Sequence, residues 1–226
     1  MKSLFTQFAG ALAVALISHS VLAQAFFGPD AGPYFRVEGG GALTQDGRVT
    51  EFNGFAAGNK ISYDAGMAVA AAIGYKFNKY LSAELESGFI GNELDRVEGF
   101  NFHDTFLYNV PLLANLTLEC PIPRTIITPY VGAGVGGAFT VFDADYFSNG
   151  RVTLYGSEDD FVFAYGFFAG VRFDLNERMS LGVRYQYFAT DDVTFSYDSA
   201  FGGPDLHLGI EGVRSHVITV SFNFKF

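Results

Sequence analysis

The sequence is poor in cysteine and in charge. Its 226 residues include one cysteine, Cys120, and charged residues make up only 17% of the chain. A single cysteine excludes an internal disulfide framework, and its distance from the amino-terminus excludes a lipid anchor at a signal-cleavage point. No cysteines and histidines cluster with the spacing of a metal site. We therefore expect neither a metal nor a cofactor.

Basic residues are also scarce. The chain has 14 Lys and Arg against 24 Asp and Glu, a formal net charge of −10. Proteins that bind nucleic acid carry a basic footprint, so we expect no nucleic-acid partner. Apolar residues make up 49% of the chain, too many for a disordered segment. The length fits one domain.

Long apolar runs are missing after the amino-terminus. Residues 8–17 form a ten-residue apolar run behind Lys2, and Val21-Leu-Ala23 offers a small-residue cleavage site. This pattern predicts a signal peptide over residues 1–23, a short lead over 24–33 and one domain over 34–226. No later stretch has the ~18 apolar residues of a membrane helix. A mature chain that spans a membrane must then be a β-barrel, because only helices and closed barrels satisfy their backbone groups in lipid.

The last nine residues alternate between apolar and polar side chains. The apolar ones end the chain as Phe222, Phe224 and Phe226, with Asn223 and Lys225 between them. Period-two alternation predicts a strand with two different faces. Aromatic residues gather where membrane strands meet the lipid–water interface, which explains such an ending.

Alternation elsewhere predicts seven more strands. The eight predicted strands span residues 34–43, 61–77, 80–91, 102–119, 125–142, 161–173, 179–188 and 208–226. The long connections are residues 44–60, 92–101, 143–160 and 189–207, and they alternate with three short turns. This organisation is typical of an all-β, transmembrane antiparallel up-and-down β-barrel with both termini on the periplasmic side. Such a protein lies in the outer membrane and contacts its lipid.

Each predicted strand has one continuous apolar face, which we assign to lipid. The opposite face is rich in small residues, such as Gly132, Gly134 and Gly136, which suit the narrow interior of a small barrel. Pro111 lies inside a strand, where its missing N–H predicts a local bulge or kink. His216 falls on the lipid-facing side, near the outer end of its strand.

Several stretches resemble a known family. They are Asn109-Val-Pro-Leu-Leu-Ala-Asn115, Thr128-Pro-Tyr-Val-Gly-Ala-Gly134, residues 174–187 and the terminal Val220–Phe226. The chain resembles the small eight-stranded outer-membrane barrels of Gram-negative bacteria, the OmpA/OmpX-type and opacity-type surface proteins. The resemblance implies that the barrel-assembly machinery reads Phe222, Phe224 and Phe226, and that the role is structural or adhesive at the cell surface.

The inward-facing positions collect charged residues. They are Arg36, Glu38, Lys76, Glu84, Glu86, Arg172 and Arg184. Unpaired charges inside a barrel are costly, so we expect these side chains to pair and plug the lumen, with Glu84 or Glu86 against Arg184 and Arg36. An eight-stranded barrel is only wide enough for side chains to fill. The alternative is a narrow porin-like pore for small solutes.

Enzyme motifs are weak. Gly132–Gly137 formally matches G-x-G-x-x-G but lies mid-strand, without the helix that a nucleotide site needs. His103, His207 and His216 are candidate bases, and Ser215 is next to His216, yet adjacent strand residues point to opposite faces. We therefore expect no catalysis, and an outer-membrane lipid-modifying enzyme remains the second alternative.

The long connections carry many carboxylates. They are Asp143, Asp145, Glu158, Asp159, Asp160, Asp191, Asp192, Asp198 and Asp205. Clustered carboxylates could bind Ca²⁺, but the spacing differs from an EF-hand, so a solvated acidic rim is the simpler interpretation. Binding residues concentrate on loops held by a rigid scaffold. We therefore expect a monomer that binds a host or surface ligand through these connections.

Overall fold

The computed structural model describes residues 27–52, 55–148, 153–197 and 206–226. The predicted signal peptide, residues 1–23, and the start of the lead over 24–33 lie outside these residues. Within the described part, no helix is long and apolar enough to cross a membrane.

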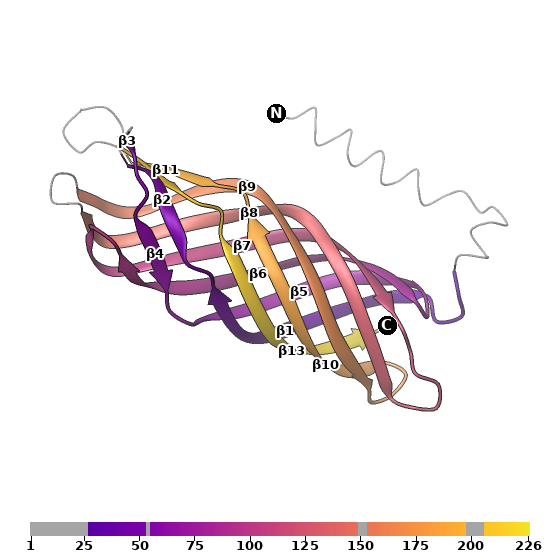
Figure 1. The fold of residues 1–226 in the computed structure, drawn as a ribbon. Helices are drawn as coiled ribbons and strands as arrows, with labels where there is room; N and C mark the ends of the chain where they lie inside the picture. The colour runs from indigo at the N-terminus through magenta and orange to yellow at the C-terminus, as the bar shows by residue number, and fades with distance from the viewer. Residues whose placement is uncertain (1–26, 53–54, 149–152, 198–205) are drawn as a thin grey trace, which may run out of the picture.

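Eight long antiparallel strands form a closed ring (Figure 1). They are β1 (Gly32–Thr44), β5 (Gly66–Asn78), β6 (Leu81–Val97), β7 (Asn101–Glu119), β8 (Ile127–Ser148), β9 (Thr153–Asp174), β10 (Met179–Thr190) and β13 (Arg214–Lys225). They follow one another around the ring in chain order, and β13 pairs with β1 from Tyr34↔Lys225 to Thr44↔Ser215. The predicted all-β barrel of eight strands is confirmed.

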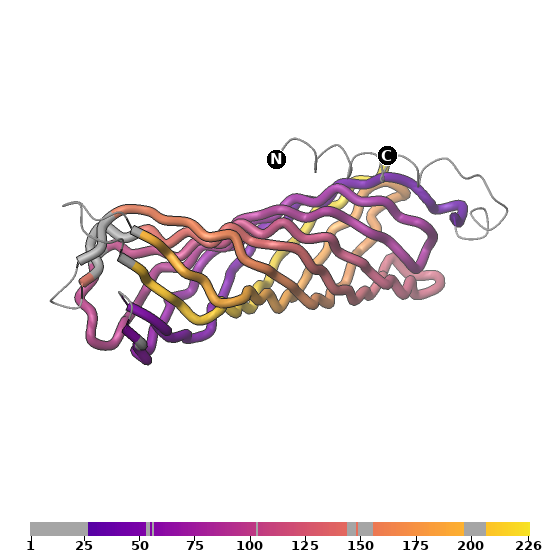
Figure 2. Tube along the Cα trace, turned by 90° about the horizontal axis from the view of Figure 1, so that it is seen from above, coloured from indigo at the N-terminus to yellow at the C-terminus, as the bar shows by residue number. Residues whose placement is uncertain are grey.

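Both ends of the described chain meet at one end of the ring, which also holds the three short turns. The backbone N–H of Phe226 donates to the carbonyl of Pro33, and Lys225 Nζ donates to the carbonyl of Asp30. We call this the short-turn end. The opposite, extended end carries the long connections, and Figure 2 shows how far the molecule stretches between the two.

The extended end contains more strand than the sequence pattern predicted. Five short strands lie there: β2 (Gly47–Phe52), β3 (Phe55–Ala56), β4 (Lys60–Tyr63), β11 (Val193–Tyr197) and β12 (Leu206–Ile210). The connection predicted over 44–60 therefore contains β2 and β3, and the one predicted over 189–207 contains β11 and the start of β12, with 53–54 and 198–205 outside the described part. The connections predicted over 92–101 and 143–160 are mostly the prolonged ends of β6, β7, β8 and β9. Conversely, two strands predicted as continuous are each broken, at Asp64-Ala65 and at residues 211–213.

A buried apolar cluster explains this extra strand. The extended core consists of Val49, Phe52, Ile61, Leu94, Val97, Leu107, Phe142, Val162, Val193, Phe195, Leu208, Ile210 and Val213. Burying this apolar surface stabilises strands that would otherwise stay solvated loops. The extended end is thus a packed β structure whose core lies in continuation of the ring.

The two faces of the ring are as predicted. Large apolar side chains of the outer face are 48–69% exposed: Val69, Ile73, Leu85, Leu112, Leu116, Val131, Val135, Phe163, Phe167, Val183, Ile218 and Val220. Their neighbours on the inner face, such as Thr219 and Ser221, are buried. Gly134 faces inward beside Asn115, whose Oδ1 occupies the space that a Cβ would need.

Of the bulge or kink predicted at Pro111, the bulge is wrong. β7 pairs with β8 through Pro111↔Ala138 without a shift of register. The register to β6 is also the same before and after it, with Ser87↔Leu112 and Ile90↔Asn109. Gly88 and Phe89 of β6 have no paired residue on β7. This short gap in the β6–β7 ladder lies opposite Pro111 and accommodates its missing N–H.

Candidate functional site in the barrel lumen

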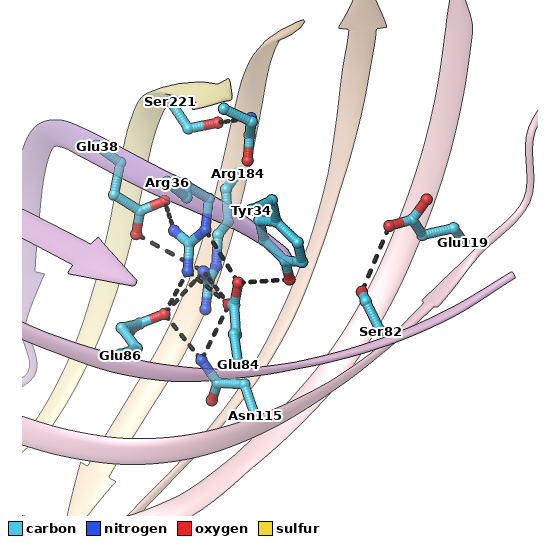
Figure 3. A network of polar contacts seen from close by, with 11 residues as sticks. Tyr34, Arg36, Glu38, Ser82, Glu84, Glu86, Asn115, Glu119, Arg184 and Ser221 are labelled. Atoms are coloured by element: carbon cyan, nitrogen blue, oxygen red, sulfur yellow. Dashed lines mark hydrogen bonds and ion pairs between the residues drawn. The ribbon is translucent and has the colours of Figure 1, made fainter. Parts of the chain in front are cut away.

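Five charged side chains meet inside the ring. Arg36 and Glu38 project from β1, Glu84 and Glu86 from β6, and Arg184 from β10, because alternate strand residues share one face. Each side chain is at most 6% exposed. We call these residues the central charge cluster (Figure 3).

Arg36 is the hub of the central charge cluster. Its Nη2 lies 2.6 Å from Glu84 Oε1 and 2.6 Å from Glu86 Oε2, and its Nη1 pairs with Glu38. Charge-assisted hydrogen bonds of this kind are roughly twice as strong as neutral ones. One guanidinium thus binds three carboxylates from two strands.

Arg184 reaches the same carboxylates from the far wall. Its Nη1 lies 2.9 Å from Glu86 Oε2, and 3.7 Å from both Glu38 Oε1 and Glu84 Oε1. Its guanidinium carbon stands 3.8 Å from the centre of the Phe168 ring, a cation–π contact. Among the described residues, its Nε and Nη2 have no hydrogen-bond partner.

Two neutral side chains complete the cluster. The Tyr34 hydroxyl donates to Glu84 Oε2 at 3.0 Å. Asn115 Nδ2 donates to Glu84 Oε1 at 3.2 Å and to Glu86 Oε2 at 2.9 Å. Neither residue was predicted, because the predicted network consisted of charged residues alone, although Tyr34 and Asn115 have the inward parity of their strands.

The other two predicted lumen residues belong to a second cluster, nearer the short-turn end. Lys76 Nζ lies 2.6 Å from Glu119 Oε2, and Arg172 Nη2 lies 2.8 Å from the same oxygen. Arg172 Nε also lies 2.9 Å from Asp174 Oδ1. The seven residues predicted as one network therefore form two. The prediction missed Glu119, the last residue of β7, whose inward parity with Asn115 could have revealed it.

An apolar layer lies on the other side of the central charge cluster, toward the extended end. It consists of Ala42, Ala68, Ile90, Leu113, Ala138, Ala164, Phe188 and Val217. These positions follow the charged residues along the same inward-facing rows, so charged and apolar layers stack along the barrel axis. The extended core described above forms a third layer.

A cavity of about 380 Å³ opens at the short-turn end. The short-turn residues Lys79 and Arg178 form part of its mouth, and Arg36, Glu84, Phe168 and Arg184 form its closed inner end. We call this cavity the vestibule.

The candidate catalytic histidines form no triad among the described residues. His216 Nδ1 lies 2.7 Å from the Tyr185 hydroxyl, and its Nε2 lies 2.6 Å from Gln45 Nε2. His207 Nδ1 lies 3.1 Å from the Ser196 hydroxyl, but no described carboxylate is placed to orient its ring. The side chain of His103 lies outside the described part.

The acidic connections form no metal cluster within the described residues. Asp160 Oδ2 instead accepts from the Thr194 backbone N–H, and Asp192 Oδ1 from that of Gly212. Asp198 and Asp205, and the side chain of Asp145, lie outside the described part.

Two titrating groups at the extended end have shifted pKa values. Lys60 Nζ lies 2.6 Å from Asp46 Oδ2, and this hydrogen bond lowers the pKa of the exposed Asp46 carboxyl. Burial raises the pKa of the Tyr63 hydroxyl, and the charges of Asp46 and Glu211 add to that effect. The residues that contact Asp46 and Tyr63 do not form a catalytic arrangement with them.

Comparison with known proteins supports the barrel. A family model described as outer membrane protein beta-barrel domain matches residues 9–226. No curated protein sequence matches the chain.

Solved structures share the fold at low sequence identity. Neisserial surface protein A is 16% identical, with a TM-score of 0.53 over 87% of this chain and 99% of that one. OprG from Pseudomonas aeruginosa is 16% identical, with a TM-score of 0.54 over 85% and 96%. The outer membrane protease OmpT from Escherichia coli is 10% identical, with a TM-score of 0.53 over 88% and 98%. These likenesses concern the fold alone.

Proposed function

The chain belongs to the outer membrane protein beta-barrel domain family, and from that premise we propose that it is a surface-recognition protein with a closed lumen. Family membership places the ring in the outer membrane. The short-turn end then faces the periplasm, and the extended end faces outward. One observation carries the proposal: buried charged and apolar side chains lie in successive layers inside the ring, while the strands of the outer end pack around a core of their own.

The layers support a closed lumen. The central charge cluster crosses the ring, and Leu113 and Phe188, both fully buried, lie above it. A solute would have to part buried ion pairs and then apolar side chains, and both steps are costly.

The outer end supports recognition. Its strands hold a core of their own, and exposed acidic side chains cover its outside, including Asp95, Glu98 and Asp159. Rigid scaffolds that present polar surface residues are where binding sites concentrate. The ligand would be a host or surface molecule, bound by a monomeric barrel.

Two experiments test the two halves of the proposal. Purified protein in planar bilayers should show no steady conductance, and a stable open channel would refute the closed lumen. Cells that carry Asp95→Asn, Glu98→Gln and Asp159→Asn together should attach less well to host cells or surfaces. Glu177→Gln, in a short periplasmic turn, is the matched control and should leave attachment unchanged.

A narrow pore is the alternative function. It predicts solute uptake that depends on the protein, together with unchanged attachment in the variant that lacks Asp95, Glu98 and Asp159.

A lipid-modifying enzyme is the second alternative, since one structural neighbour is a protease. The simultaneous substitution of His103, His207 and His216 by Gln would then abolish a lipid-hydrolysis activity of the purified protein.

Assembly is the remaining part of the proposal. Phe222 and Phe224 lie at the end of β13 and Phe226 follows it, all on the lipid side, and the barrel-assembly machinery would read them there.

A further inference from the structure

The vestibule has the size and composition of a binding site. Its volume of about 380 Å³ lies within the usual range for small-molecule pockets, ~300–1,000 Å³. Seven cationic and five acidic side chains line it, so its wall carries two more positive than negative charges, although the whole chain is acidic. Its mouth opens to the periplasm.

Two hydrogen-bond donors without partners lie at the closed end of the vestibule. Arg184 lines the vestibule there, and it is 1% exposed. Its Nη1 contacts Glu86, but within the described residues its Nε and Nη2 are buried without partners. Leaving buried donors unpaired is costly, most of all on a charged group. These two nitrogens form the edge of a guanidinium that binds a carboxylate or phosphate bidentately.

Tyr130 lies near the strand positions around Arg184. Arg184 pairs in register with Gly170, and a Cβ on Gly170 would collide with the ring and hydroxyl of Tyr130. Tyr130 and Arg184 both line the vestibule, and Phe168, which packs against the Arg184 guanidinium, lines it too.

We propose that the vestibule binds a small periplasmic solute bearing a carboxylate or phosphate group, held bidentately by Nε and Nη2 of Arg184. Glu38, Glu84 and Glu86 all meet Arg184 through Nη1, so none of the three occupies the donors at Nε and Nη2. Lys79, Arg178 and Lys225 outnumber the acidic side chains at the mouth, Asp30 and Glu177, and they attract an anion inward. The site is independent of whatever the outer end recognises.

The test uses the folded full-length barrel in dodecyl maltoside micelles, which contain no phosphate headgroups. Inorganic phosphate and acetate are titrated at constant ionic strength while the Nε–H signal of Arg184 is followed by NMR. A saturable shift with either anion is the expected result. No shift with either would overturn the proposal.

Two variants locate the site by ligand-observed NMR. Arg184→Lys keeps the charge but loses the bidentate edge, so affinity should fall about tenfold, the effect of one lost charge-assisted hydrogen bond. Ser180→Trp fills the vestibule near its mouth without touching the central charge cluster, and it should abolish binding. Arg214→Lys, on the exposed outer end, is the control. Unchanged affinity in both Arg184→Lys and Ser180→Trp would contradict the assignment.

A second arm distinguishes a free solute from a lipid headgroup. In phosphatidylglycerol nanodiscs, a free-solute site should still respond to added phosphate. An Nε–H signal that is already shifted in nanodiscs, and that phosphate does not move in micelles, would overturn the free-solute assignment.

Discussion

Arg184 on β10 and Glu86 on β6 form an ion pair, Nη1 to Oε2 at 2.9 Å, between strands on opposite sides of the ring. Arg36 ties β1 to the same Glu86 carboxylate. The Arg184–Glu86 pair therefore links the barrel across its diameter, and the Arg36–Glu86 pair links β1 to β6, two strands away in the ring.

Removal of one guanidinium should destabilise the barrel strongly. Arg184→Met leaves three buried carboxylates with Arg36 alone, and breaking a buried ion pair costs about 3–5 kcal/mol. Reversible urea unfolding in lipid vesicles measures this loss. Arg214→Met is the control, because that exposed residue pairs with the partly exposed Glu211, and the change should stay within about 0.5 kcal/mol. Equal effects of the two variants would show that the cluster does not brace the ring.

Loss of the central charge cluster alone should not open a channel. The double variant Arg36→Ala with Glu86→Ala removes four of the cluster's six ion pairs and leaves only the 3.7 Å pairs of Arg184 with Glu38 and Glu84. The apolar layer around Leu113 and Phe188 is unchanged in this variant. Planar-bilayer conductance should therefore stay at the level of the unmodified protein. A stable rise in conductance would mean that the charges are the only barrier.

A charged residue on the outer face of the ring should lower the stability of the barrel. Val220 is 62% exposed near the middle of β13, so Val220→Arg places a cation in the lipid, at a cost of roughly 2–4 kcal/mol near the midplane. Thr194→Arg, exposed on β11 outside the membrane ring, should cost less than about 0.5 kcal/mol. The free energy of unfolding in vesicles distinguishes them. The reverse order would invert every facing assignment, because a one-residue slip flips all side chains to the other face.

The ring was predictable from sequence because alternation is a strong signal where one face meets lipid. The outer end was not, because its strands are short and its apolar residues are spread over distant segments. Val49, Phe195 and Leu208 each stand in a short run, and only their contact in space shows that they share one core. Tertiary burial decided their structure, and local sequence pattern did not.

The charged residues of the lumen were predictable in part, again because of the alternation along each strand. Parity alone placed Arg36, Glu84, Glu86 and Arg184 inside the ring. Partner choice depends on register and side-chain length, which alternation does not encode. Arg172 therefore pairs with Glu119, two strands away, although its position on the inner face was correctly anticipated.

The outer end should be loosened by a change in its own core. Phe195 is fully buried against Phe142, so Phe195→Ala should cost about 3–5 kcal/mol locally. Protease should then cut within β11 or β12, while the gel shift on boiling shows that the membrane ring is intact. Phe55→Ala, at a side chain 76% exposed, should leave the protease pattern unchanged. If both variants resist protease, the extended core does not stabilise these strands.

The terminal aromatic residues should separate assembly in cells from stability of the finished barrel. Phe35 on β1 packs against Phe222, Phe224 and Phe226, with ring centres 6.0–6.5 Å apart across the closing seam.

Phe226 itself is 70% exposed, so Phe226→Ala, which removes the ring contacts with Phe35 and Phe224, should cost the folded barrel less than Phe35→Ala. If the assembly machinery reads this residue, the same variant should greatly reduce the assembled fraction in cells. Phe35→Ala should do the opposite, because it removes three ring contacts worth about 0.5–1.5 kcal/mol each and leaves the terminal residues unchanged. Heat-modifiable protein in outer membranes reports the first effect, and urea unfolding of purified barrels reports the second. If each variant lowers both the assembled fraction in cells and the stability of the purified barrel to the same extent, the terminal residues act only by stabilising the seam between β1 and β13.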